Sequence, residues 1–162
     1  MNFIKTTALL TATTLLVGCA DDPKYTATLS GDEAGASGAG EIILNSTDQT
    51  IQVALTITGM SMDALFDGLV EAPIGPIHLH HGGPGERGPI AIPFVMSDGA
   101  YAETADGFTV TYTALEYGPS AALVSSELDF ASFTKELKAG NIYFNVHTDS
   151  FPGGGLRGAL GQ

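Results

Sequence analysis

Histidine is the residue type whose distribution in this sequence most clearly indicates chemistry. Three of the four histidines, His78, His80 and His81, lie in one short segment, and His147 lies in a later one. Residues two apart in a β-strand point to the same face with Cα atoms ~6.5–7 Å apart, so the imidazoles of His78 and His80 can converge on one ion. His147 supplies a third ligand if its strand is a neighbour of theirs.

Three neutral imidazoles without a thiolate suit copper(II) or zinc, and they leave one coordination position open for water or a small ligand. His81 points to the opposite face if the strand continues through it, so it is a candidate fourth ligand only if the turn at Gly82 and Gly83 bends it back. The alternative is a polar pocket in which each ring hydrogen-bonds to the backbone and binds nothing. The pattern predicts a metal site at His78, His80 and His147.

Several other kinds of site are not indicated. The sequence has no Ser-His-Asp order and no Cys-His pair, and the glycines of residues 82–88 lack both the strand-loop-helix setting and the Lys-Ser/Thr of a nucleotide loop. The formal net charge is −12 and the pI is near 4.3, so nucleic acid would be repelled. We therefore expect neither a hydrolase nor a nucleic-acid-binding protein.

The segments that must position the histidines read as short strands. Ile51, Val53, Leu55 and Ile57 alternate with polar or small residues, which is typical of a half-buried strand. Further strand candidates are residues 25–29, 41–44, 77–80, 90–95, 108–112, 141–148 and 156–160.

Between the strand candidates, residues 31–40 are rich in Gly, Ala and Ser and are predicted to form a loop. Short helices are predicted at residues 60–70 and 129–138. Seven or eight short strands separated by Gly/Pro turns predict an all-β fold, a Greek-key-like antiparallel β-sandwich with short helical insertions.

The N-terminus has the parts of an export signal. Lys5 precedes an apolar stretch at residues 8–17, which is followed by the single cysteine, Cys19. The stretch is too short to span a bilayer, which needs ~20 apolar residues. Leu-Val-Gly-Cys at residues 16–19 resembles the lipobox of bacterial lipoproteins, in which the signal is cut before the cysteine and its thiol carries diacylglycerol.

This resemblance predicts three parts of the chain: a lipoprotein signal peptide at residues 1–18, a lipidated tether at residues 19–24, and one domain at residues 25–162. An ordinary secretory signal with an incidental or free Cys19 is the alternative. By resemblance to lipoprotein sorting, Ala20 favours the outer membrane, facing the periplasm or the cell surface.

Three stretches of the domain share a further pattern. They are YTATLSGDE at residues 25–33, IHLHHG at residues 77–82 followed by GPI at residues 88–90, and GNIYFNVHT at residues 140–148 followed by FPGG at residues 151–154 and LRG at residues 156–158. Together they resemble the CHRD domain, named from chordin and common in bacterial exported proteins. The sequence departs from that pattern in having Gly155 where an acidic residue is common, and in a longer stretch between Gly59 and Ile77.

The CHRD pattern is similar, more distantly, to copper-zinc superoxide dismutase. By that resemblance His78, His80 and His147 match copper ligands, and Arg157 matches an arginine that guides an anion to the copper, although Arg157 could instead pair with an acidic neighbour or a terminal carbonyl. Residues 82–146 contain no histidine and the chain has one cysteine, so that family's bridging ligand, zinc ligands and disulfide are missing.

Two functions follow from the sequence. The first is a lipid-anchored envelope protein that binds copper or another divalent metal at the three histidines, for metal handling or small redox chemistry. Whether it is an enzyme stays open; if it is, the resemblance implies a copper-dependent, superoxide dismutase-like oxidoreductase. The second is a non-catalytic surface or structural module that binds a protein or glycan partner.

Overall fold

The computed structural model describes residues 22–83, 85–96, 99–117 and 128–162. The predicted signal peptide and Cys19 lie outside these residues. Among the described residues, none of the helices has the length and apolar content that a membrane span requires.

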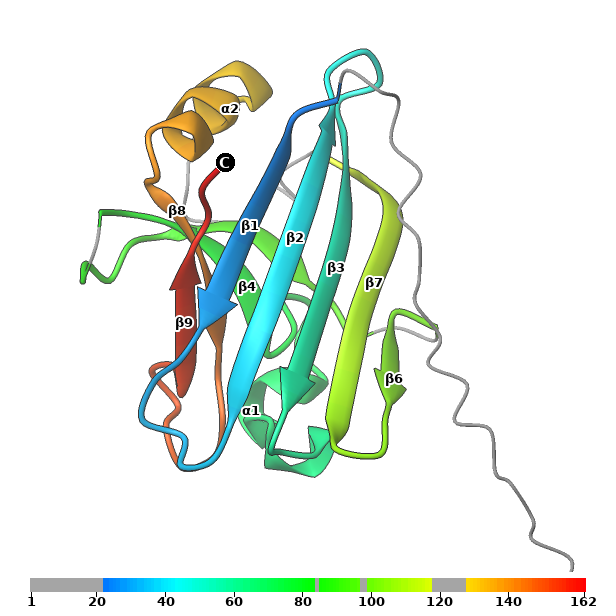
Figure 1. Ribbon diagram of the computed structural model, residues 1–162, viewed down its shortest axis with the longest axis vertical. Coiled ribbons are helices and arrows are strands. Elements are labelled where there is room, and N and C mark those ends of the chain that lie inside the picture. Colours follow the sequence, from blue (N-terminus) through cyan, green and yellow to red (C-terminus); the bar gives the residue numbers. More distant parts are fainter. Residues whose placement is uncertain (1–21, 84, 97–98, 118–127) are drawn as a thin grey trace, which may run out of the picture.

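The first of two antiparallel sheets contains five strands in the order β1-β2-β3-β7-β6. It forms the front layer in Figure 1. The strand bounds are β1 Lys24–Leu29, β2 Ser37–Asn45, β3 Thr50–Thr58, β6 Tyr101–Glu103 and β7 Gly107–Glu116.

The second sheet contains four strands in the order β5-β4-β8-β9 and packs behind the first. Its strands are β4 Ile77–His81, β5 Ile90–Phe94, β8 Ile142–Val146 and β9 Leu156–Ala159. Backbone bridges between Thr26 and Gly161 and between Ser30 and Arg157 join the two sheets along β1 and β9. The predicted all-β sandwich is confirmed.

The hydrophobic core lies between the sheets. In β3, the predicted alternation holds, because Ile51, Val53, Leu55 and Ile57 are buried. From the second sheet, Phe144 points toward β2, where a Cβ at Gly40 would come within 2.5 Å of its ring. Since side chains alternate along a strand, the neighbours of Phe144 in β8 point away from this core, to the outer face of the second sheet.

Small residues explain why the predicted loop at residues 31–40 is partly wrong. β2 already begins at Ser37 and pairs with β3 through Gly38 and Gly40. These glycines do not indicate a loop here. They leave room for the side chains of Ile57 and Phe144, which would collide with a Cβ at Gly38 and Gly40, respectively.

The two predicted helical regions have different outcomes. α2, Phe130–Lys138, forms as expected, with Asp129 as the N-cap that accepts a hydrogen bond from the Ser132 N–H at 2.7 Å. The predicted helix at residues 60–70 is split into the 3₁₀ turn η1, Met62–Ala64, and the four-residue helix α1, Asp67–Val70. Between them Leu65 is extended and fully buried, and it forms a backbone bridge with Thr148.

The contact between Gly40 and Phe144 yields a test of the sheet packing. We expect Gly40→Ala to lower the free energy of unfolding by about 1–3 kcal/mol, because the added methyl overpacks the space that the Phe144 ring fills. Urea unfolding of the variant and the wild type measures the difference. Gly161→Ala is the matched control, because its Cβ meets nothing within 4 Å; equal losses in the two variants would contradict this packing.

Candidate metal centre

The pairing of β4 with β8 brings the distant histidines together. In this antiparallel register His78 lies opposite Asn145 and His80 lies opposite Tyr143. His147 follows the last residue of β8, and its backbone N–H donates to Pro76 O at 2.9 Å. The condition set by the sequence, that the two histidine segments be neighbours, is therefore met.

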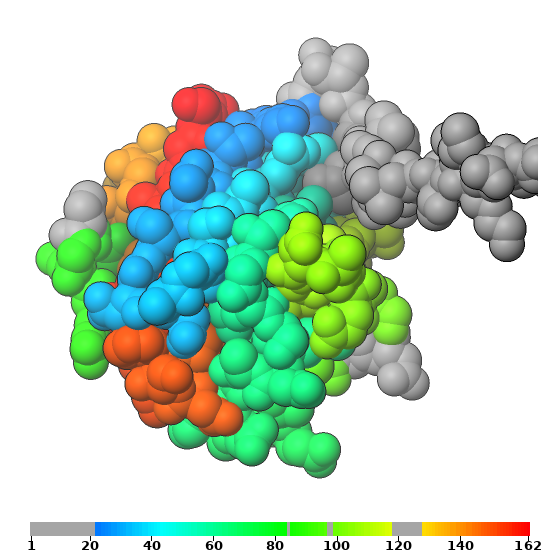
Figure 2. Space-filling view, turned by 60° about the horizontal axis from the view of Figure 1, so that its bottom comes forward, coloured from blue at the N-terminus to red at the C-terminus, as the bar shows by residue number. Residues whose placement is uncertain are grey.

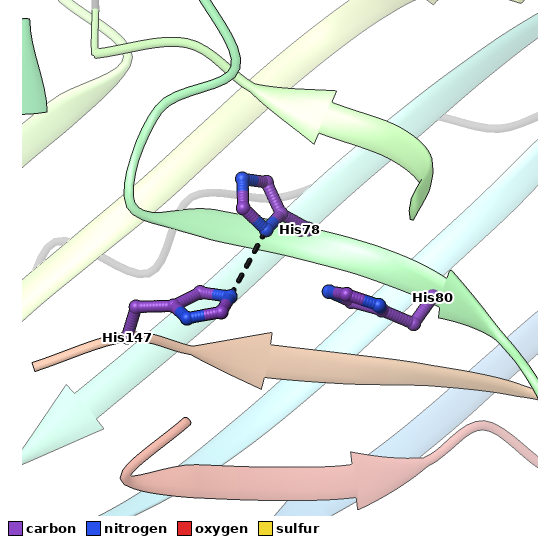
Figure 3. Close-up of side chains that lie close together, drawn as sticks. All are labelled: His78, His80 and His147. Atoms are coloured by element: carbon purple, nitrogen blue, oxygen red, sulfur yellow. Dashed lines mark hydrogen bonds between the residues drawn. The ribbon is translucent and has the colours of Figure 1, made fainter. Parts of the chain in front are cut away.

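The imidazoles of His78, His80 and His147 form one compact group on the outer face of the second sheet. One ligand nitrogen from each ring lies within 4.8 Å of the others. Figure 3 shows the three rings facing one another, with His78 Nδ1 and His147 Nε2 separated by 3.1 Å. Tetrahedral metal–imidazole bonds of ~2.0–2.1 Å place two donors ~3.3–3.4 Å apart, so the spacing fits one ion.

Each ring is held from behind by a backbone carbonyl of a different loop. His78 Nε2 lies 2.8 Å from Gly75 O, His80 Nδ1 lies 2.8 Å from Gly88 O, and His147 Nδ1 lies 2.7 Å from Pro152 O. A carbonyl oxygen only accepts, so the hydrogen of each neutral ring must sit on the nitrogen that faces the carbonyl. This arrangement fixes all three tautomers.

The fixed tautomers leave three lone pairs directed at one another, of which only that of His147 Nε2 accepts a hydrogen bond, from Asn145 Nδ2 at 3.0 Å. His78 Nδ1 and His147 Nε2 both act as acceptors at 3.1 Å, and His80 Nε2 is buried without a hydrogen-bond partner. Acceptors at such a distance repel each other unless a cation lies between them, and a buried acceptor without a partner costs about 1–3 kcal/mol. The donor set therefore fits a metal ion.

Burial keeps the rings neutral and available as ligands. Desolvation, together with the smaller effect of the neighbouring rings of His147 and His80, lowers the pKa of His78 to about 3. Burial is also the main reason why the pKa values of His80 and His147 lie below the ordinary value, and the positive charge of Arg157 lowers both further. At neutral pH none of the three carries a proton that would exclude a metal.

The loop that carries Pro152 is tied to the opposite sheet. Thr148 Oγ1 donates to Glu33 Oε2 at 2.6 Å, and the Glu33 N–H donates to Gly155 O at 3.3 Å. In Figure 2 the loop after β8, in orange, lies against the loop between β1 and β2, in light blue. These contacts fix the backbone that orients His147.

Two residues that were not singled out from the sequence complete the surroundings. Tyr143 stacks on His80 with ring centroids 5.3 Å apart, and its hydroxyl accepts from the Gly88 N–H and donates to Glu86 O. Asn145 donates from Nδ2 to His147 Nε2 at 3.0 Å. Each lies an even number of residues before His147, which places it on the same face of the strand. This spacing is the one signal in the sequence that could have identified the two residues.

The other predicted site residues lie outside the group of three. His81 points away, with Nε2 3.6 Å from Glu136 Oε2 on α2. Arg157, on β9, lies opposite Asn145 on β8. It donates from Nε to Asn145 Oδ1 at 3.1 Å and from Nη2 to Gly153 O at 2.7 Å. Its guanidinium thus contacts two carbonyl oxygens next to the histidines.

Burial of neutral His78 makes the metal-free protein acid-sensitive. The folded pKa of about 3 lies below the unfolded value of 6.5, so between these pH values the unfolded state binds a proton that the folded state does not. The free energy of unfolding should therefore decrease as the pH is lowered through this window, and His78 should contribute about 1.4 kcal/mol per pH unit to this decrease. Denaturant unfolding in chelator at pH 7 to 4 measures this slope, and His78→Gln should reduce it; parallel curves for both proteins would contradict the assignment.

Comparison with known protein families agrees with the sequence motifs. The model of the CHRD domain matches residues 25–160, a range that contains His78, His80 and His147.

 The match begins at the second residue of β1 and extends through the last strand, β9. No curated protein and no solved structure matches the chain closely enough to add to this assignment. Since the matched region spans most of the sequence, the chain belongs to the CHRD domain family.

Proposed function

We propose that this protein binds one copper ion, or another divalent metal ion, through His78 Nδ1, His80 Nε2 and His147 Nε2. The observation that carries the proposal is that three ring nitrogens direct their lone pairs inward. His78 Nδ1 and His147 Nε2 are 3.1 Å apart, and His80 Nε2 is buried without a hydrogen-bond partner. A cation at their common centre would satisfy all three nitrogens at once.

The chemistry of the donors supports copper(II) or zinc. Imidazole nitrogen suits both ions, and for a given set of nitrogen ligands copper(II) binds more tightly than zinc. Three histidines leave a further coordination position open in either case. Bound copper would supply one-electron redox chemistry, whereas zinc would not.

The rest of the chain would orient the ligands and limit access by water. The carbonyls of Gly75, Gly88 and Pro152 hold each ring with its lone pair inward, the role that outer-shell partners take in metal sites. His78 is fully buried and His80 and His147 are each 9 % exposed, so the group of three is almost closed to solvent.

The proposal also includes the membrane anchor. We infer that Cys19 is acylated and that it tethers the domain at the cell envelope, in the outer membrane, facing the periplasm or the cell surface. The support is the Leu-Val-Gly-Cys motif at residues 16–19, which follows an apolar stretch and a basic residue. The first strand starts at Lys24, which leaves a short tether between Cys19 and the sandwich.

Metal content tests the histidine site. We expect the wild type to bind one copper(II) or zinc ion per chain. The double variant His78→Ala/His80→Ala should lose affinity by more than the ~10–100-fold that outer-shell changes usually cause, because it removes two ligands. Equilibrium dialysis against competing chelators, followed by elemental analysis, measures both proteins.

His81→Ala is the matched control for that experiment, because His81 lies in the same strand but faces Glu136. It should bind metal as the wild type does. If neither the wild type nor the control binds metal, the histidines are packing residues, and the non-catalytic module for a protein or glycan partner becomes the better account.

Lipidation is tested separately at Cys19. In a bacterial host that processes lipoproteins, the wild type should fractionate with membranes, and its mature N-terminal peptide should carry the mass of diacylglycerol on Cys19. Cys19→Ala should remove both the lipid mass and the membrane association. An unmodified Cys19 in a secreted wild-type protein would contradict the anchor and leave the metal site unaffected.

A further inference from the structure

Asn145 occupies the centre of the outer face of the second sheet. It lies opposite His78 on β4 and opposite Arg157 on β9, so one row across three strands holds a ligand, an amide and a guanidinium. The side chain is almost fully buried, with 2 % exposed. A buried amide in this position must have its donors and acceptors satisfied locally.

The orientation of the amide is fixed from the side of β9. Arg157 Nε donates to Asn145 Oδ1 at 3.1 Å, and because a guanidinium only donates, the atom that faces it must be the oxygen. The second contact of the guanidinium, from Nη2 to Gly153 O at 2.7 Å, holds Arg157 itself in place. The amide NH₂ group thereby faces His147 Nε2 at 3.0 Å and Gly153 O at 3.5 Å.

Gly154 closes the amide in from the other side. Its φ is 121°, and a Cβ at this residue would lie 2.0 Å from Asn145 Oδ1. The loop can pass this close only because residue 154 is a glycine. The amide therefore has little freedom to turn its oxygen toward the histidines.

The NH₂ group meets the lone pair that a metal would take. Asn145 Nδ2 donates to His147 Nε2 at 3.0 Å, the same nitrogen that points at His78 Nδ1. Once a metal ion binds His147 Nε2, that hydrogen bond is lost and the NH₂ group keeps only its 3.5 Å contact with Gly153 O, so one of its two buried hydrogens has no acceptor, which is costly. A fourth ligand with lone pairs of its own, in the open coordination position, would accept the hydrogen bond instead.

We propose that Asn145 donates a hydrogen bond to a small anion that occupies the open coordination position, and that Arg157 is a positioning residue that acts by orienting Asn145. This inference rests on the proposed function, since it requires a metal at the three histidines. The selected ligand class is a small anion, because both the amide N–H and the nearby guanidinium favour negative charge.

Azide is the probe for this site, because it is a small anion whose binding to copper(II) produces a charge-transfer absorption band. The full-length protein is loaded with copper(II), and azide is titrated while the band and the electron paramagnetic resonance spectrum are recorded. We expect Asn145→Leu to weaken azide binding about 10-fold, the worth of one hydrogen bond to a charged group. Copper affinity should stay unchanged or rise, because the competing hydrogen bond to His147 is gone.

Asn145→Asp covers the case in which the leucine variant fails to fold, because it keeps the size of the side chain and the contact with Arg157. It removes the donor and adds a negative charge, so azide should bind more than ~10-fold more weakly. Asn141→Leu is the matched control: Asn141 also donates from Nδ2 to a side chain, Glu136, but lies outside the histidine group. It should bind copper and azide as the wild type does.

Arg157→Met, alone and combined with Asn145→Leu, separates positioning from direct attraction of the anion. If Arg157 acts through Asn145, the single variants should lose similar azide affinity and the double variant should lose no more. Additive losses would overturn the positioning role, and unchanged azide affinity in both Asn145 variants would overturn the inference altogether. A wild type that binds no copper would instead overturn the proposed function.

Discussion

The close approach of His78 Nδ1 and His147 Nε2, at 3.1 Å, is the constraint on which the rest of this structure depends. Because each ring donates its hydrogen to a backbone carbonyl, the two nitrogens face each other as lone pairs. His80 adds a third lone pair with no partner. A cation at this point would be coordinated by all three nitrogens at once, which is the basis of the proposed metal site.

The fold makes this arrangement possible by covering the outer face of its second sheet. Three loops, which contain Gly75, Gly88 and Pro152, each provide one backbone carbonyl that accepts a hydrogen bond from one histidine. The core side chains Leu79 and Phe144 point the other way, between the sheets. The hydrophobic packing and the polar cluster therefore lie on opposite faces of the same strands, and a change in one need not disturb the other.

Part of this site could be predicted from the sequence, and the reasons are physical. The two-residue period of a strand puts His78 and His80 on one face, and this prediction needs no tertiary information. The contribution of His147 depended on β4 pairing with β8, a contact between residues 69 apart in the sequence, which no local pattern specifies. The family motif supplied that link.

Other parts could not be predicted because they depend on backbone atoms and close packing. The carbonyls of Gly75, Gly88 and Pro152 fix the tautomers, but every residue has a carbonyl, so the sequence does not mark these three. Gly38 and Gly40 indicated a loop, although their lack of a side chain in fact makes room for Ile57 and Phe144. The direction of the Asn145 amide depends on its contact with Arg157 across the sheet, which no local sequence pattern specifies.

The most direct measurement of the central claim is the tautomeric state of the histidines, from long-range ¹H–¹⁵N correlation spectra of the metal-free protein at neutral pH. The account predicts hydrogens on His78 Nε2, His80 Nδ1 and His147 Nδ1, and a shift of the opposite nitrogen of each ring when one equivalent of Zn²⁺ is added. Hydrogens on the inward nitrogens, or inward nitrogens that do not respond to Zn²⁺, would contradict it.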